Sequence, residues 1–140
     1  MSETAGAPAT SGAARLGLSA GQAVQERGYD HDVDHDLRDE VEDLTGEQML
    51  DEHDVDVVDA VLLWWREDDG DLVDALVDSL VSLADDGVVW LLTPKAGSPG
   101  HVRPSDVEEA APTAGLFATS TVKPSPDWTA IRLVSGRGRR

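Results

Sequence analysis

The chain has 140 residues, a formal net charge of −17 and no cysteine. This length suits one ordinary domain, the lack of cysteine excludes disulfides and thiolate metal sites, and no stretch approaches the roughly 20 apolar residues of a membrane span. The opening MSETAGAPATSGAA has neither the basic start nor the apolar segment of a secretory signal, so we expect a cytoplasmic protein.

The negative charge is concentrated in one part of the chain. Residues 26–86 hold 23 of the 28 acidic residues and three arginines, so the other residues carry a small net positive charge. Such an acidic field repels nucleic acid and anionic membranes, and the terminal GRGRR is too short to argue for nucleic-acid binding by itself. The charge favours a protein partner with a basic surface, or serves solubility alone.

Composition divides the chain into a tail, a domain and a second tail. Residues 1–18 are rich in Ala, Gly, Ser, Thr and Pro without periodicity, which predicts a disordered N-terminal tail. A single α/β domain is expected over residues 19–134, beginning with a short strand around Gln22 to Glu26. Residues 135–140 form a basic C-terminal tail.

Carboxylates stand at every second position in DHDVDHD, residues 30–36. A calcium loop of the EF-hand type needs Gly at its sixth position and Glu at its twelfth. Counted from Asp30 these positions hold His35 and Val41, so that motif is absent. A zinc site built with the nearby histidines is the other reading of the segment. We favour an acidic start of a helix that continues to Leu44 and ends at Gly46, and we assign no metal ligand.

The central stretch, Val57 to Lys95, predicts a strand, a helix and a second strand. The first strand is the apolar run from Val57 to Trp65. Leucines then recur at helical spacing after an N-cap at Asp68 or Asp69, and Gly87 follows the end of that pattern. The second strand covers residues 88–92, before Pro94. This order is typical of a parallel βαβ unit with a right-handed crossover.

The last part of the chain predicts one helix and a hairpin. Ser105 and Glu108 have the spacing of a capping box, which places the start of a helix there. That helix is interrupted by Pro112 and ends at Gly115. Two strands, residues 117–123 and 128–134, then form an antiparallel pair that completes the sheet.

Two resemblances rest on these segments. The Asp-led strand from Asp59, the leucine-rich helix, the strand entry LADDGVVWLLTP and the final hairpin resemble the second half of a Rossmann-like methyltransferase. The strings VVDAVLLWWR, DGDLVDAL, LADDGVVWLLTPK, EAAPTAGL and TSTV are more closely similar to an uncharacterised actinobacterial family, a domain of unknown function. Together they imply a three-layer α/β Rossmann-like domain with a mixed, mostly parallel sheet and a C-terminal antiparallel hairpin, and they imply no activity.

One departure from the methyltransferases bears on cofactor binding. Those enzymes hold the methionyl part of S-adenosylmethionine against a glycine-rich turn after the first strand, where missing side chains let the backbone approach the ligand. Here that turn falls at Arg27 to Asp30, RGYD, with a single glycine. We therefore expect no cofactor in the usual mode.

Candidate ligand contacts follow from the expected sheet, because ligands of open α/β sheets lie beyond the carboxyl ends of the strands. Trp64 and Trp65, as neighbours in a strand, must face opposite sides of the sheet. Asp59, within an apolar strand, needs a partner, for which we expect a backbone amide. The candidate crevice residues are Trp64, Trp65, Arg66, Thr93, Lys95 and His101.

No catalytic arrangement of Ser, His and Asp is defensible in this sequence, and no catalytic residue is assigned. The function favoured by the sequence is a non-catalytic acidic interaction or regulatory module with a protein partner. The alternative is a small-molecule or nucleotide-binding protein derived from a degenerate Rossmann-like methyltransferase.

Overall fold

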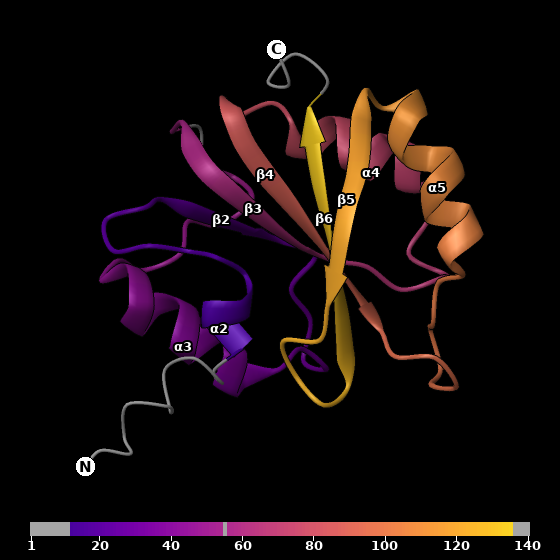
Figure 1. Ribbon diagram of the computed structural model, residues 1–140, viewed down its shortest axis with the longest axis horizontal. Coiled ribbons are helices and arrows are strands. Elements are labelled where there is room, and N and C mark those ends of the chain that lie inside the picture. The colour runs from indigo at the N-terminus through magenta and orange to yellow at the C-terminus, as the bar shows by residue number, and fades with distance from the viewer. Residues whose placement is uncertain (1–11, 55, 136–140) are drawn as a thin grey trace.

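The computed structural model describes residues 12–54 and 56–135 (Figure 1). No helix in these ranges is long and apolar enough to cross a bilayer. In chain order the elements are α2 (Gly12–Arg15), β2 (Val24–Arg27), α3 (His35–Thr45), β3 (Val58–Trp64), α4 (Leu72–Ser79), β4 (Leu83–Pro94), α5 (Pro104–Thr113), β5 (Leu116–Val122) and β6 (Trp128–Ser135).

One mixed sheet holds the five named strands in the order β2-β3-β4-β6-β5. The first three are parallel, and β6 runs antiparallel between β4 and β5. Because β3 and β4 are parallel neighbours joined by α4, they form the βαβ unit expected from the sequence. The hairpin of β5 and β6 likewise confirms the predicted antiparallel end of the sheet.

Helices cover both faces of the sheet, so the domain has three layers (Figure 1). On one face, Ala13 of α2 and Leu37 and Val41 of α3 join a buried cluster with Trp64 and Trp90 of the sheet. On the other face, residues of α4 and α5 form a second cluster with the sheet, including Leu76, Val107, Ala110, Val61 and Leu91. The predicted fold class is confirmed.

The acidic segment at residues 30–36 leads into α3, as predicted. Asp34 is the N-cap, and its side chain accepts a hydrogen bond of 2.8 Å from the amide of Leu37. Gly46 ends the helix with φ of 78°, a left-handed conformation that costs glycine little. In this way the carboxylates of the segment serve a helix N-terminus.

The expected end of the central helix is wrong. The helix α4 is capped by Asp71, whose side chain accepts from the amide of Asp74, and it ends at Ser79, a full turn before the apolar pattern does. Leu83 already belongs to β4, opposite Val58, and Gly87 lies inside that strand. The six residues from Leu83 to Val88 face only three of β3, Val58 to Ala60, which produces a bulge. Pairing with β3 therefore outweighs the local helical pattern.

The capping box expected at Ser105 is also absent. Pro104 occupies the first turn of α5, Arg103 is the N-cap, and no side chain makes a capping hydrogen bond there. Proline at this position fixes φ near the helical value and has no amide that needs a partner.

The disordered N-terminal tail predicted over residues 1–18 is too long. Residues 1–11 lie outside the described part of the chain, but Gly12 to Leu18 are folded against the sheet. Ala13, Leu16 and Leu18 are buried, with exposures of 1%, 3% and 8%. A few buried small and apolar side chains are enough to hold this segment against the sheet. They lie in a polar, low-complexity stretch, and so few of them form no periodic pattern in the sequence. Residues 136–140, most of the expected basic tail, lie outside the described residues.

This docking leads to a prediction. Replacing Leu16 with Ala removes a buried side chain and should lower the free energy of unfolding by about 2–5 kcal/mol. Leu44→Ala, at a position 36% exposed, is the matched control and should cost about 1 kcal/mol or less. Urea denaturation followed by tryptophan fluorescence measures both, and equal effects of the two substitutions would contradict the assignment of residue 16 to the core.

Candidate functional site

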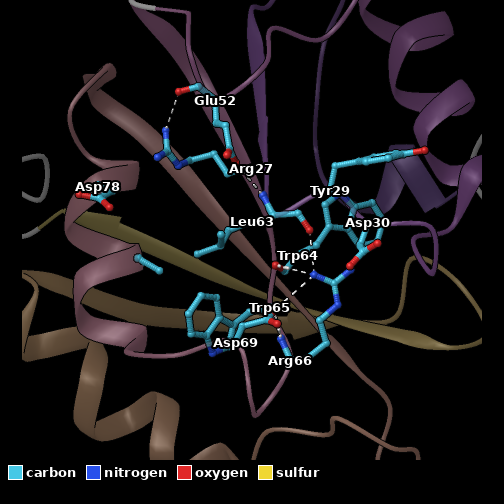
Figure 2. Close-up of a pocket in the computed structure, with 12 residues that line it drawn as sticks. Arg27, Tyr29, Asp30, Glu52, Leu63, Trp64, Trp65, Arg66, Asp69 and Asp78 are labelled. Atoms are coloured by element: carbon cyan, nitrogen blue, oxygen red, sulfur yellow. Dashed lines mark hydrogen bonds and ion pairs between the residues drawn. The ribbon is translucent and has the colours of Figure 1, made fainter.

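A cavity of about 300 Å³ lies at the carboxyl ends of β2 and β3 (Figure 2). The turn after β2 forms one wall, and the last residues of β3 form the floor. A connector between α3 and β3 and the helix α4 complete the rim. The lining residues are Arg27, Gly28, Tyr29, Asp30, Glu52, Leu63, Trp64, Trp65, Arg66, Asp69, Ala75 and Asp78.

The turn after β2 packs directly against the end of β3 through Gly28. Its φ is 76°, and a Cβ atom at this position would lie 2.2 Å from the carbonyl oxygen of Trp64. Only glycine fits both the backbone conformation and the close approach. The amide of Gly28 donates to Glu52 Oε1 at 3.2 Å, and its carbonyl accepts from Arg66 Nη1 at 2.8 Å. Both backbone groups of this glycine are thus used within the protein.

The guanidinium of Arg66 joins the segments around the cavity. Besides Gly28, it donates to the carbonyl of Trp64 at 3.3 Å and to Asp69 at 3.3 Å, and it forms an ion pair with Asp32. It also lies 5.3 Å from the ring centroid of Trp128. Burial opposes its charge, but hydrogen bonds and charges of Asp32 and Asp69 prevail and raise the pKa of Arg66. The side chain of Arg66 is only 12% exposed, and its charge serves to hold these neighbouring groups together.

On the other side of the same wall, the buried carboxylate of Glu26 binds two neighbouring side chains. Glu26 of β2 is 8% exposed and accepts hydrogen bonds from Arg38 Nε at 2.7 Å and Nη2 at 2.9 Å. It also accepts from the indole Nε1 of Trp64 at 2.9 Å. The bidentate bond to Glu26 raises the pKa of Arg38, whose guanidinium also lies over the ring of Tyr29. The buried charge of Glu26 is therefore fully partnered, and it orients Trp64.

The cavity is acidic. Four carboxylates line it, from Asp30, Glu52, Asp69 and Asp78, against the two guanidiniums of Arg27 and Arg66. Hydrogen bonds from the backbone and the ring of the neighbouring histidine lower the pKa of Asp30. The lining therefore suits a positively charged group in contact with the ring of Trp65.

The structure separates the predicted site residues into two groups. Trp64, Trp65 and Arg66 line the cavity, and the two indoles belong to the clusters on opposite faces of the sheet, as predicted. Thr93, Lys95 and His101 lie near the end of β4, outside its lining. Thr93 is buried, Lys95 Nζ lies 3.4 Å from Asp127, and His101 Nδ1 lies 2.9 Å from the carbonyl of Pro94.

The expected partner of Asp59 is confirmed. Its Oδ2 accepts a hydrogen bond of 2.9 Å from the backbone amide of Ala23, just before β2. The side chain is exposed, so its charge also keeps contact with water. Asp59 therefore aligns two parallel strands at their amino ends.

Several cavity residues were missed from the sequence. Glu52 reaches the cavity because Leu50 forms a parallel bridge with Gln25, which brings the acidic connector beside the end of β2. The apolar pair Met49 and Leu50, directly before the acidic connector, is the signal in the sequence that could have indicated this bridge. Asp78 lies on the exposed side of α4 and gives no such signal. Within residues 12–54 and 56–135 there is no group of three or more His, Cys, Asp or Glu side chains able to hold a metal ion.

Solved structures share this architecture. A SAM-dependent methyltransferase from Aquifex aeolicus gives a TM-score of 0.57 over 86% of this chain and 85% of its own, at 12% identity. The O-methyltransferase NcsB1 from neocarzinostatin biosynthesis gives 0.63 over 94% of this chain and 53% of its own, at 14% identity. The fold is thus the Rossmann-like fold of methyltransferases, and identities this low indicate the fold alone.

The family is indicated more closely by sequence. Residues 13–137 match the family described as "Protein of unknown function (DUF3052)", and the chain belongs to this family. The uncharacterized protein Rv2239c of Mycobacterium tuberculosis is 51% identical over 127 residues, which are 91% of this chain and 80% of that protein. The uncharacterized protein Mb2263c of Mycobacterium bovis matches equally well. The resemblance to an actinobacterial family of unknown function is confirmed.

The close approach at Gly28 leads to a prediction with a matched control. Gly28→Ala introduces left-handed strain and a clash with the Trp64 carbonyl, whereas Gly46→Ala has a similar φ of 78° and open space around its Cβ position. We expect Gly46→Ala to lower the free energy of unfolding by about 1–2 kcal/mol and Gly28→Ala by about 1–3 kcal/mol more. Equal losses in chemical denaturation would show that the contact with β3 is unimportant.

The buried carboxylate allows a second prediction. Glu26→Gln leaves the guanidinium of Arg38 without its charge partner and should cost about 2–4 kcal/mol of stability. Adding Arg38→Met should recover part of this loss, because the unpaired charge is then removed. Glu47→Gln, at an exposed position after α3, is the control and should stay within about 0.5 kcal/mol of the wild type. Thermal and urea unfolding of the four proteins provide the measurement.

Proposed function

We propose that this protein is a non-catalytic binding module that engages a positively charged segment of a partner protein at the carboxyl edge of its sheet. The observation that carries the proposal is the acidic cavity, whose lining includes four carboxylates and Trp65. A lysine or arginine side chain combines a cation with an apolar stem, which matches carboxylates beside an indole.

The surroundings of the cavity extend the same charge. The connector that carries Glu52 also contains Asp51, Asp54 and Asp56, all exposed, and Glu67 and Asp68 follow the end of β3. A partner segment crossing this edge would meet negative charge on both sides of the cavity. Such complementarity raises association rates and orients the partner.

The composition of the cavity supports a role without catalysis. Its lining holds carboxylates, guanidiniums and aromatic rings, with no Ser, Thr, His or Lys side chain. Among the described residues, His101 and Lys95, which the sequence offered as candidates, lie near the end of β4 and contact Pro94 and Asp127. The cavity lining therefore offers carboxylates but no Ser, Thr, His or Lys side chain beside them.

The residues present do not fit S-adenosylmethionine in the mode expected of the fold. The turn after β2 offers one glycine, and Glu52 and Arg66 already occupy the amide and carbonyl of that glycine. The backbone groups of Gly28 are thus hydrogen-bonded to the protein's own side chains and are not free to hold the methionyl group.

A peptide-binding measurement tests the proposal. A fluorescent oligo-lysine or oligo-arginine peptide should bind the full chain in a salt-dependent way. The double variant Glu52→Gln/Asp78→Asn should weaken binding by about three- to tenfold, since each exposed ion pair contributes little alone. Glu108→Gln/Glu109→Gln removes the same charge from exposed positions on α5 and should change affinity less than about twofold.

The controls make the outcome decisive. Equal weakening by the two double variants would mean that the peptide responds to net charge alone, which contradicts a site at the cavity. Absence of binding at low salt would contradict the proposal directly. With a positive result, affinity capture from host cells with the wild type and the cavity variant, side by side, identifies the natural partner.

The second candidate function is binding of a small molecule or nucleotide in the same cavity. Its volume of about 300 Å³ reaches the lower end of the range for small-ligand sites. One protein of similar fold, NcsB1, was crystallised in complex with S-adenosyl-L-homocysteine. Calorimetric titration with S-adenosylmethionine, S-adenosylhomocysteine and common nucleotides separates the two functions. A one-site response that Gly28→Ala abolishes while the variant remains folded favours this candidate, and a flat screen removes it.

A further inference from the structure

A second cavity, of about 280 Å³, lies at the opposite end of β3 from the acidic one. One wall is the segment that follows α2, from Arg15 to Leu18, together with Gln22. The floor consists of residues from β3, β4, β6 and β5, most of whose side chains point to the same face of the sheet. These floor residues are Asp59, Ala60, Val88, Trp90, Ser120, Val122 and Arg132.

The strand register places a cation in the middle of this floor. Trp90 of β4 pairs with Arg132 of β6, which in turn pairs with Ser120 of β5. The three side chains therefore form a row across the sheet, with the guanidinium flanked by an indole and a hydroxyl. Trp90 is 3% exposed, so the layer beneath the cavity is apolar and well packed.

A second guanidinium lies on the wall. Arg15 donates one hydrogen bond to the carbonyl of Lys123 at 2.8 Å, and Arg132 donates one to Thr119 Oγ1 at 3.0 Å. Among residues 12–54 and 56–135 neither arginine has a carboxylate within ion-pair distance, and neither has Arg27, whereas Arg38, Arg66 and Arg103 all do. In a chain with 28 acidic and 11 basic residues, two arginines without carboxylate partners meet in one cavity.

The balance of charge is the reverse of that in the acidic cavity. The two arginines face one carboxylate, that of Asp59, which already accepts the amide of Ala23. A guanidinium has five N–H donors, so most donors of both arginines are available to a ligand. Their fork geometry matches a carboxylate, and the apolar floor matches a hydrocarbon group.

We infer that this second cavity binds a small organic carboxylate with an apolar body. The carboxylate would pair with Arg132 and Arg15, while the hydrocarbon part contacts the half-buried side chains of Val88 and Val122. The cavity is slightly smaller than the roughly 300–1,000 Å³ typical of drug-sized ligands, which restricts it to a compact molecule. The net charge of −17 on the whole chain disfavours nucleotides and other multiply charged anions more than it disfavours a single carboxylate. This site is separate from the one in the proposed function and does not depend on it.

Titration of the full chain with benzoate, followed by two-dimensional NMR of backbone amides and indole N–H groups, tests the inference. Benzoate should give saturable shifts at Leu16 to Leu18, Ser120 and the indole of Trp90. Benzamide, which has the same shape without the charge, should bind at least about tenfold more weakly, and so should inorganic phosphate, which lacks the apolar body. Shifts confined to the acidic cavity would contradict the inference.

Variants identify the cations involved. Arg132→Gln and Arg15→Gln should each weaken benzoate binding by about tenfold, because each removes a charge-assisted hydrogen bond. Arg103→Gln, exposed at the start of α5 and paired with Asp106, carries the same charge change and should leave the affinity unchanged.

Three outcomes overturn the inference: no saturable response to benzoate, phosphate binding as tight as benzoate, or equal weakening by Arg103→Gln. If Arg132→Gln fails to fold, the exposed Arg15→Gln and the comparison of benzoate with benzamide on the wild type decide the result.

Discussion

The contact between Gly28 and the carbonyl of Trp64 determines how the carboxyl edge of this sheet is built. The turn after β2 rests on the end of β3 with no room for a side chain. Arg66 then bonds the carbonyls of both residues and pairs with Asp32, on the same segment as Gly28, and with Asp69, on its own segment. Because one largely buried guanidinium joins the segment after β2 to the segment after β3, the edge is closed by the protein's own groups.

The closed carboxyl edge of this sheet differs from the ligand site that open α/β sheets usually have there. In open α/β sheets the carboxyl edge is the usual ligand site, because backbone groups and loops converge there. Here the convergent backbone groups of Gly28 are satisfied internally, and exposed carboxylates dominate what remains. The fold is shared, but the groups available to a ligand at this edge are charged side chains and not the backbone groups of Gly28.

The cavities at the two ends of the central strand β3 differ in charge. The acidic cavity lies at the carboxyl end of β3, and the cavity with Arg15 and Arg132 lies toward its amino end on the face that carries α2. The sequence already showed this asymmetry, with the acidic residues concentrated between residues 26 and 86. Folding converts it into two cavities of opposite charge balance, since β6 and α2 supply the arginines from outside the acidic stretch.

The sequence by itself determined the layered α/β architecture, the central βαβ unit, the hairpin and the family, because runs of apolar residues and capping signals are local. It also located the turn at Arg27 to Asp30 and the crevice residues Trp64 to Arg66. Only the tertiary structure decided that α4 ends at Ser79, since the bulged pairing of Leu83 and Val88 with β3 depends on a neighbouring strand. It likewise decided the docking of Ala13 and Leu16, the contribution of Glu52, and the meeting of Arg15 with Arg132. These contacts join residues far apart in the chain, and no local pattern encodes such pairs.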